Sequence, residues 1–508
     1  MKKSKLENII LPGKDCRSRW TISLDADTIT AINPAETASS SPSSLLLPPL
    51  CHPHIHLDKA YILTCNNNDI HRTQPGSWSP DDGDRSSGVP DYGDLAPQSG
   101  SFSEALTKTS EAKRRYTPED LYLRGAQLLG TSLTQGVTAC RAFVELDHVT
   151  QTLCLEAAIS LQASFAGKVA VQICAFAQDP IFSTDHGDEN RRILDAALDR
   201  DRQQQQEQQQ QQGHRRRIGA LGTTPYVETS RDASMRNIEW AIETSLEHEL
   251  NLDFHLDYNL NPDRPAMVWD VIRLLKEARW TERARPDKTI VLGHCTRLTL
   301  FRRDEMARLA GEIRDSRLPV HFVGLPTSDL FMMGRPPDNN GGDGDDDDDD
   351  EATAIRPRGT MQVLDMIKGG INACLSVNNV GNAFTPWGTG DPISLASLGV
   401  GIYQAGTEDD ATRLYECVST RARRAIGLTG VGGSRGDGSG SEEPGLPIEE
   451  GRKGDLLLIR NEEWVGCPGH LSMKIPARQR VSVRDVVWDP PDVKLRRIII
   501  PFRIGVQP

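Results

Sequence analysis

The feature that most constrains the fold is a pair of histidines, His54 and His56, that closely follows an apolar run at residues 45–50. The run is typical of a β-strand, and on an extended backbone the two imidazoles point to the same face. Two imidazoles side by side supply half of a metal site, and a catalytic site needs about one or two further ligands plus an open position for water. The rest of the chain therefore has to bring further ligands to this point.

Strand-like segments alternate with helical patterns through the middle of the chain, which is typical of a parallel sheet with helical connections. Thr117, Pro118 and the two acids that follow mark the start of one helix, with a capping side chain and negative charge near the N-terminus. Eight alternations predict an α/β fold, a (β/α)₈ TIM barrel with its active site at the carboxyl ends of the strands. The candidate strands are residues 45–50, 137–143, 169–176, 218–221, 252–255, 289–294, 320–323 and 371–377.

Short β-rich segments flank this central unit on both sides. We predict that residues 1–50 and 446–508 come together as a small β-sandwich, and that the barrel occupies residues 51–428. A glutamine-rich insertion at 201–217 and an aspartate-rich insertion at 336–351 interrupt the barrel, and both are predicted to be disordered surface loops. The β-rich segments are residues 9–11, 20–24 and 28–32 in the first part and 454–459, 481–483 and 497–500 in the second.

The net charge of −13 does not indicate a nucleic-acid partner. Eight acids and no base lie between residues 343 and 351, so the remainder carries only about −5, and no basic stripe offsets that balance. No apolar run approaches the roughly 20 residues that span a bilayer, and the first residues lack the apolar core of a secretory signal. With ten scattered cysteines and no Cys-x-x-Cys pair, the sequence predicts a cytoplasmic protein with reduced thiols and no membrane partner.

Two further histidines, His255 and His294, end the fifth and sixth candidate strands. A single histidine at such a position is usually a satisfied core or rim residue. Four histidines at the ends of three barrel strands favour a metal site instead, because these strand ends meet at one mouth of the barrel. The fourth strand ends without a lysine, so no carbamylated lysine is available to bridge two metals, and the pattern favours a single ion.

With these residues in place, the chain resembles the amidohydrolase superfamily of metal-dependent hydrolases, and within it the cytosine deaminase-like branch. The resemblance covers most of the chain outside the insertions. It rests on HIHLD at 54–58, RAFVE at 141–145, AFAQDPI at 175–181, HLDY at 255–258, GHCT at 293–296, MGR at 333–335, NNV at 378–380 and GT at 388–389.

The resemblance implies roles for individual residues. His54, His56 and His255 correspond to ligands of one divalent ion, zinc or iron, and His294 to the residue that polarises and orients the metal-bound water. Gln178 corresponds to the amide that grips the ring edge of a small heterocyclic substrate. The activity implied is hydrolysis of a non-peptide carbon–nitrogen bond in a cyclic amidine or amide, by deamination or by ring or amide hydrolysis with metal-activated water.

Two positions depart from the family pattern. Tyr258 stands where the family has a proton-shuttling glutamate, and Asn378 where it has an aspartate that acts as ligand and general base. A phenol with a pKa near roughly 10 is a poor base at neutral pH, and an amide has no carboxylate to accept a proton. Asp257 is a possible substitute, although on a regular strand it faces away from Tyr258. The catalytic set expected is therefore His294, Asn378, Asp257 and Tyr258.

Arg335 and Phe384 complete the expected substrate-binding set with Gln178, although a loop-anchoring ion pair and simple packing are the alternatives for these two. An alternative for the whole protein stays open as well. The missing glutamate and aspartate also fit a catalytically silent barrel that serves as a binding or scaffold protein. The substrate, the metal and the oligomeric state are open at this stage, a homo-oligomer included.

Overall fold

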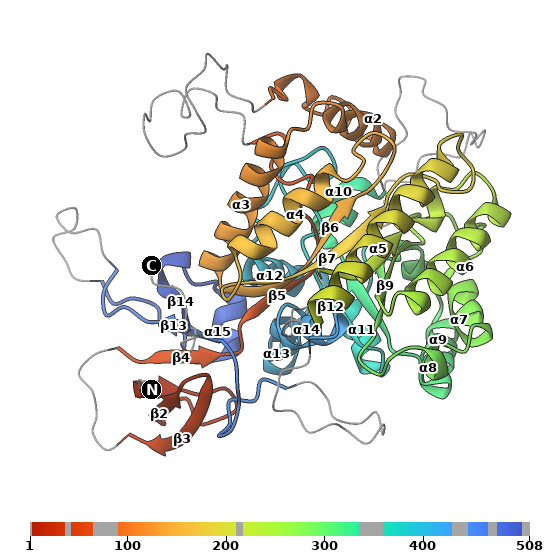
Figure 1. Ribbon diagram of the computed structural model, residues 1–508. Helices are drawn as coiled ribbons and strands as arrows, with labels where there is room; N and C mark the ends of the chain where they lie inside the picture. Colours follow the sequence, from red (N-terminus) through yellow and green to blue (C-terminus); the bar gives the residue numbers. More distant parts are fainter. Residues whose placement is uncertain are drawn as a thin grey trace, which may run out of the picture.

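Two β-sheets organise the chain, an eight-stranded parallel sheet and a six-stranded mixed sheet beside it (Figure 1). The structure is a computed structural model of the 508-residue chain. It describes residues 3–35, 42–64, 90–209, 217–334, 359–428, 445–465 and 475–499.

The eight-stranded sheet is the predicted barrel. Its strands follow one another in chain order, and each pairs in parallel with the next. The two edges meet where Ile55 in the first strand bridges Asn378, just after the last strand, and the backbone N–H of His56 donates to the Asn378 carbonyl at 2.9 Å. The α/β barrel predicted from the sequence is therefore confirmed. Its strands are β5 (Leu50–His56), β6 (Val137–Glu145), β7 (Ala170–Ala177), β8 (Ile218–Thr223), β9 (Asn251–Leu256), β10 (Ile290–His294), β11 (Val320–Gly324) and β12 (Ala373–Leu375).

Helices connect these strands and bury their apolar faces against them, giving one large core. The helix predicted after Thr117 begins as expected: the Thr117 hydroxyl accepts from the Asp120 N–H, and Pro118 is its first residue. The helices around the barrel are α2 (Phe102–Lys113), α3 (Pro118–Gln135), α4 (Leu153–Ser164), α5 (Gly187–Gln209), α6 (Arg231–Glu247), α7 (Val268–Glu277), α8 (Trp280–Arg283), α9 (Arg303–Ser316), α10 (Pro326–Met332), α11 (Val363–Lys368), α12 (Pro392–Ile402), α13 (Glu408–Cys417) and α14 (Thr420–Ala425), with short 3₁₀ turns η1 (Gly93–Leu95), η2 (Pro225–Val227) and η3 (Thr296–Leu300).

The apolar run at 45–50 belongs to two different sheets, which corrects the single strand expected there. β4 (Ser44–Leu47) lies in the six-stranded sheet, and β5 starts the barrel at Leu50. Pro48 and Pro49 separate them, because proline has no N–H to donate to a ladder. The carbonyl of Pro48 accepts from the Tyr415 hydroxyl at 2.7 Å. His54 and His56 therefore lie inside the first barrel strand instead of after it.

The six-stranded sheet joins both ends of the chain, as predicted. Its order is β14-β13-β4-β1-β2-β3, and it has its own small apolar core. One expected strand at 481–483 is wrong: Ser482 caps helix α15 (Val483–Trp488), with its hydroxyl accepting from the Asp485 N–H. The other elements of this unit are β1 (Lys3–Ile10), β2 (Trp20–Asp25), β3 (Thr28–Pro34), β13 (Leu456–Arg460), η4 (Val493–Leu495) and β14 (Arg496–Ile499).

The first insertion is partly helical, which the sequence analysis did not predict. Helix α5 continues through much of the glutamine run to Gln209, because glutamine has a high helix propensity and the helix is already nucleated upstream. The aspartate-rich insertion lies outside the described residues, and the domain boundaries stay predictions. None of the helices in the described part of the chain is both long and apolar enough to cross a bilayer.

Candidate metal centre and pocket

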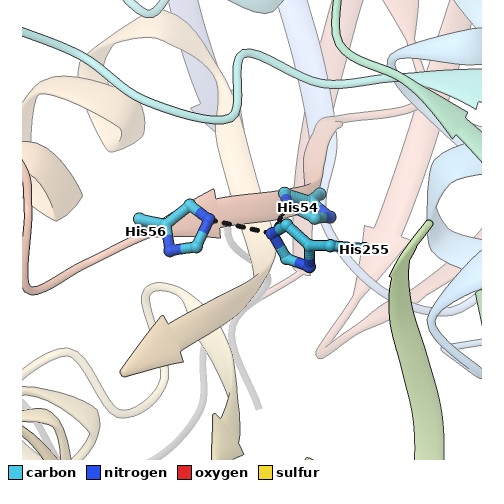
Figure 2. Close-up of side chains that lie close together, drawn as sticks. All are labelled: His54, His56 and His255. Atoms are coloured by element: carbon cyan, nitrogen blue, oxygen red, sulfur yellow. Dashed lines mark hydrogen bonds between the residues drawn. The ribbon is translucent and has the colours of Figure 1, made fainter. Parts of the chain in front are cut away.

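Three imidazoles from two strands converge inside the barrel (Figure 2). His54 and His56 come from β5 and His255 from β9. The Nε2 atom of His255 lies 3.1 Å from Nε2 of His54 and 3.2 Å from Nε2 of His56. All three side chains are buried. The three histidines therefore lie close together, as expected from the sequence.

The donor set fits one divalent ion. Burial is the main cause that lowers the pKa of all three histidines well below the usual range, so the rings are neutral and offer lone pairs at neutral pH. Two nitrogens about 2.0–2.1 Å from a common ion lie roughly 2.8–3.4 Å apart for octahedral to tetrahedral angles, a range that includes the two separations found here. The Nδ1 atoms of His54, His56 and His255 are also buried, and they have no hydrogen-bond partner among the described residues.

Aromatic side chains beneath the cluster fix the imidazole planes. Phe143 packs on His54 with ring centroids 4.2 Å apart, and Phe176 on His255 at 4.5 Å. Gly222 at the end of β8 makes room for them, since a Cβ atom there would lie 2.9 Å from Phe176 and 3.2 Å from Phe143. The space next to β8 is therefore filled with apolar rings. Among the described residues, His54, His56 and His255 are the one group of three or more side chains placed so that they could hold a metal ion.

Asn378 brings an amide oxygen to the same place. It follows β12 with a left-handed backbone (φ 60°), a conformation that asparagine tolerates better than most residues. Its Nδ2 donates to the Ser328 hydroxyl at 2.9 Å, and that hydroxyl lies 2.6 Å from Oγ1 of Thr385. Its Oδ1 is buried without a hydrogen-bond partner in the described part of the chain, and the side chain favours the charged forms of His54 and His56. The free carbonyl oxygen therefore faces the imidazoles.

His294 stands beside the cluster and is held by a buried carboxylate. Its ring centroid lies 5.1 Å from that of His255, and its Nδ1 lies 2.9 Å from Oδ1 of Asp329 in helix α10. Because a carboxylate accepts hydrogen bonds, Nδ1 carries the proton and Nε2 is the basic ring nitrogen. Tyr258 packs on the other side of the ring, with centroids 4.0 Å apart.

A pocket opens above these groups. Four of its lining residues are His56, His255, His294 and Asn378. The other lining residues are the polar side chains Lys59, Gln178 and Asn379 and the aromatic side chains Phe102, Tyr226, Tyr258 and Phe384. No carboxylate belongs to this lining within the described residues.

Lys59 fixes the orientation of Gln178. Its ammonium group donates to Oε1 of Gln178 at 3.0 Å and forms an ion pair with Glu145, while both charged side chains are almost fully buried. Lys113 completes the pairing on the far side of Glu145, at 2.7 Å from Oε2. Since Oε1 is occupied by a cation, the amide NH₂ of Gln178 is the group free to donate to a ligand.

The other predicted site residues have different surroundings. Asp257 points away from the pocket, because Oδ1 accepts from the Met267 N–H at 2.8 Å and Oδ2 from the Val268 N–H at 3.0 Å, at the start of helix α7. The structure thus gives Asp257 no path to a substrate. Phe384 lines the pocket, and Arg335 lies outside the described residues.

The sequence analysis missed Asp329 and Phe102. Asp329 lies five residues after the end of β11, in helix α10. A search for polar side chains near the carboxyl ends of the strands, which indicated His255 and His294, would have included it. Phe102 is the first residue of α2, a helix between β5 and β6, and no local pattern connects it with the pocket.

Comparisons with known proteins agree with this geometry. No protein-family model matches the sequence. The N-isopropylammelide isopropyl amidohydrolase of Pseudomonas sp. (strain ADP) is 20% identical over 448 residues, which cover 87% of each chain.

Solved structures share the whole architecture. The 5-methylcytosine deaminase from Klebsiella pneumoniae with phosphonocytosine superposes with a TM-score of 0.68 at 19% identity, covering 99% of this chain and 100% of that one. The N-isopropylammelide isopropylaminohydrolase from Burkholderia multivorans ATCC 17616 gives 0.61 at 17% identity, covering 98% and 96%. The resemblance predicted from the motifs is therefore confirmed at the level of the fold, and this chain has the fold of the amidohydrolase superfamily.

Proposed function

We propose that the chain is a mononuclear metal-dependent hydrolase that cleaves a carbon–nitrogen bond of a small planar heterocycle, a cyclic amidine or amide. One observation carries the proposal. Three neutral imidazoles, His54, His56 and His255, converge, and two of them line a pocket that also contains the amide of Gln178. The names of the similar proteins, an amidohydrolase, an aminohydrolase and a 5-methylcytosine deaminase, support this class of reaction.

The three imidazoles and Oδ1 of Asn378 would hold the ion, zinc or iron. When bound, it supplies a water acidified toward a pKa of roughly 7 for attack on an sp² carbon. His294 would orient the attacking water, because Asp329 keeps the proton on Nδ1 and leaves Nε2 as an acceptor. Ser328 would keep the carbonyl of Asn378 turned toward the imidazoles by accepting from its NH₂.

Gln178 would set the substrate's orientation. Because Oε1 accepts from Lys59, the NH₂ group is left to donate to a ligand, which suits a carbonyl oxygen or an unprotonated ring nitrogen on the substrate. The planar ring would then lie between this amide and the imidazoles. Tyr258 is buried, and burial raises its pKa well above the usual range, so it would act as a wall and not as a base.

The direct test is metal analysis of the purified protein, followed by a screen of pyrimidines, hydantoins and triazines. We expect about one divalent ion per chain and turnover that His54→Ala abolishes. A matched control is His248→Ala, a buried histidine at the C-terminal end of α6, outside the site. Protein that holds no stoichiometric metal, and gains none on reconstitution, would rule the proposal out.

A second function is favoured by the carboxylates missing at Tyr258 and Asn378. Without a proton-accepting carboxylate in the described lining, the pocket also suits a silent barrel that binds a heterocycle and does not turn it over. Metal-dependent turnover of any compound in the screen would eliminate this alternative. A small heterocycle is the partner in either case, and the cytoplasmic location, the absence of a nucleic-acid partner and the oligomeric state stay predictions.

A further inference from the structure

A buried ion pair lies inside the barrel, next to the imidazole cluster. Asp253 of β9 is two residues before His255 and shares its face of the strand, one layer closer to the amino ends of the strands. Its Oδ2 lies 2.7 Å from Nη1 of Arg141 in β6, and both side chains are fully buried. Replacing such a pair by apolar groups of similar size is often neutral or stabilising. Stability alone therefore does not explain why the barrel interior holds these two charges.

The guanidinium group of Arg141 is itself held in place. Its Nε donates to Oε1 of Gln172 in β7 at 2.7 Å, and Nε2 of Gln172 donates to the Ile426 carbonyl at 3.0 Å. Gly219 of β8 leaves room for this side chain, since a Cβ atom there would lie 2.5 Å from Cγ of Gln172. One oxygen of Asp253 is therefore bound to a fixed cation, and only Oδ1 is left for another partner.

The remaining oxygen of Asp253 lies next to His54. Oδ1 of Asp253 is buried without a hydrogen-bond partner in the described part of the chain, and so is Nδ1 of His54, 3.9 Å away. Gly293 of β10 leaves room for the His54 ring, because a Cβ atom there would lie 3.2 Å from Nδ1. Buried polar atoms are seldom left unpaired. An approach of about 1 Å would join these two atoms in one hydrogen bond.

Binding of an ion would decide which nitrogen of His54 carries the proton. Nε2 of His54 lies 3.1 Å from Nε2 of His255, so Nε2 is the atom that faces a shared ion. A neutral imidazole that binds through one ring nitrogen carries its proton on the other. Nδ1 is then a donor, and the carboxylate oxygen beside it is an acceptor. A carboxylate in this place orients the ring and makes the ligand more basic.

We propose that Asp253 is a positioning residue of the metal centre: in the metal-loaded protein its Oδ1 accepts a hydrogen bond from Nδ1–H of His54, while Arg141 holds Oδ2. This rests on the function proposed above, because it requires that His54 binds an ion. Asp253 does not belong to the pocket lining. Its effect is therefore on how tightly the ion is held.

The first test measures zinc affinity, so it does not depend on turnover. The metal-free full chain is titrated with zinc in competition with a chromophoric chelator, which gives the dissociation constant of the zinc complex. In Asp253→Asn, the amide oxygen has to accept from Arg141, so the NH₂ group faces Nδ1 of His54, which already carries a proton when Nε2 binds zinc. We expect this variant to bind zinc about 10- to 100-fold more weakly than the unmodified protein.

Asp391→Asn is the matched control. Asp391 is also a buried aspartate paired with an arginine, since Arg496 donates to its two oxygens at 2.6 and 2.8 Å. It caps helix α12 and does not belong to the pocket lining. Its zinc dissociation constant should stay within about threefold of the original, well short of the expected loss at Asp253. An equal loss in both variants would overturn the proposal, because any weakened buried ion pair would then loosen the site.

A second measurement uses the unmodified protein, so it does not depend on whether a variant folds. Protein with isotope-labelled histidine is followed by proton NMR while zinc is added. A hydrogen bond from an imidazole N–H to a buried carboxylate protects the proton from exchange and shifts its signal downfield of the backbone amides. His294 pairs with Asp329 without the ion, so its signal is the internal reference. One further signal should appear on zinc binding and be missing from Asp253→Asn.

The outcomes separate this proposal from the proposed function. A zinc affinity of Asp253→Asn within about threefold of the original, or no further histidine signal on zinc binding, would overturn the proposal and leave the hydrolase intact. A chain that binds no zinc, and that is purified without any other divalent ion, would overturn both, because His54 would then have no ion to bind.

Discussion

Replacing Asp329 by asparagine tests how the pocket uses His294. The Asp329 side chain is fully buried, with Oδ1 placed 2.9 Å from Nδ1 of His294. Its Oδ2 accepts from the Leu325 N–H at 3.2 Å and from the Thr360 hydroxyl at 3.3 Å. The Leu325 N–H is a fixed backbone donor, so the carbonyl oxygen of an asparagine has to stay on that side. The NH₂ of the asparagine then faces Nδ1 of His294.

This arrangement forces the other tautomer on His294. Nδ1 has to accept, the ring proton moves to Nε2, and the nitrogen that faces the pocket becomes a donor. A catalytic histidine held in the wrong tautomer loses about 10⁴-fold in kcat in the serine protease triad. Loss of a partner that orients a metal site costs about 10- to 100-fold. Between these cases, we expect Asp329→Asn to lower kcat about 10²- to 10⁴-fold, with little change in KM.

The assay is steady-state turnover of the substrate found in the screen, with metal content measured on the same preparations. Asp365→Asn makes the same chemical change at an exposed position of helix α11 and should behave like the unmodified protein. Metal content should be unchanged, because Asp329 contacts none of the three imidazoles proposed as ligands. A kcat within about threefold of the original at full metal occupancy would refute the tautomer argument. So would a loss of activity that simply follows a loss of metal.

Three further predictions follow from the same structure. Removing the metal with a chelator should lower the melting temperature of the protein, and adding the metal back should restore it, since a ligand at about a hundredfold above its Kd stabilises the folded state by about 2.7 kcal/mol. In the same thermal melts, His255→Ala should show no shift on metal removal. A shift equal to that of the unmodified protein would contradict the proposed ligand set. Restoring both carboxylates with Tyr258→Glu and Asn378→Asp should increase cytosine turnover, because a positioned general base contributes about 10²- to 10⁴-fold to the rate. Unchanged turnover would argue against the role given to the two missing carboxylates. Burial, with help from Arg424 and Arg141, lowers the pKa of His321 from 6.5 to about 3, so between these values only the unfolded chain binds the proton and the free energy of unfolding falls as the pH drops. His321→Gln should lose less stability than the unmodified protein between about pH 7 and 4.5 in urea titrations, and equal losses would argue against this assignment.

The barrel and its histidines could be predicted because they depend on local patterns. Apolar runs of strand length alternate with helical spacing, and the carboxyl ends of parallel strands meet at one mouth of a barrel. Once eight alternations were counted, the convergence of His54, His56 and His255 followed from topology. The N-terminus of α3 was predictable for the same reason, since Thr117 and Pro118 act within one turn of helix.

Other features depend on contacts that no local pattern encodes. Tertiary packing decided that Asp257 holds the start of α7 instead of facing the pocket, and that Asp329 pairs with His294 across 35 residues. The Ser482 cap overrode a short β-like run in the same way.

The sequence by itself thus determined which strands carry the imidazoles, because alternation and strand-end position follow from the period of the backbone. Only the tertiary structure decided how those imidazoles are oriented and what surrounds them. Lys59 orients the amide of Gln178 by a hydrogen bond, and Phe102 packs against Tyr258 in the pocket lining. Both contacts join segments far apart in the chain. Such contacts arise when the whole core packs at once, so hydrogen-bond direction and pocket shape become fixed only in the folded molecule.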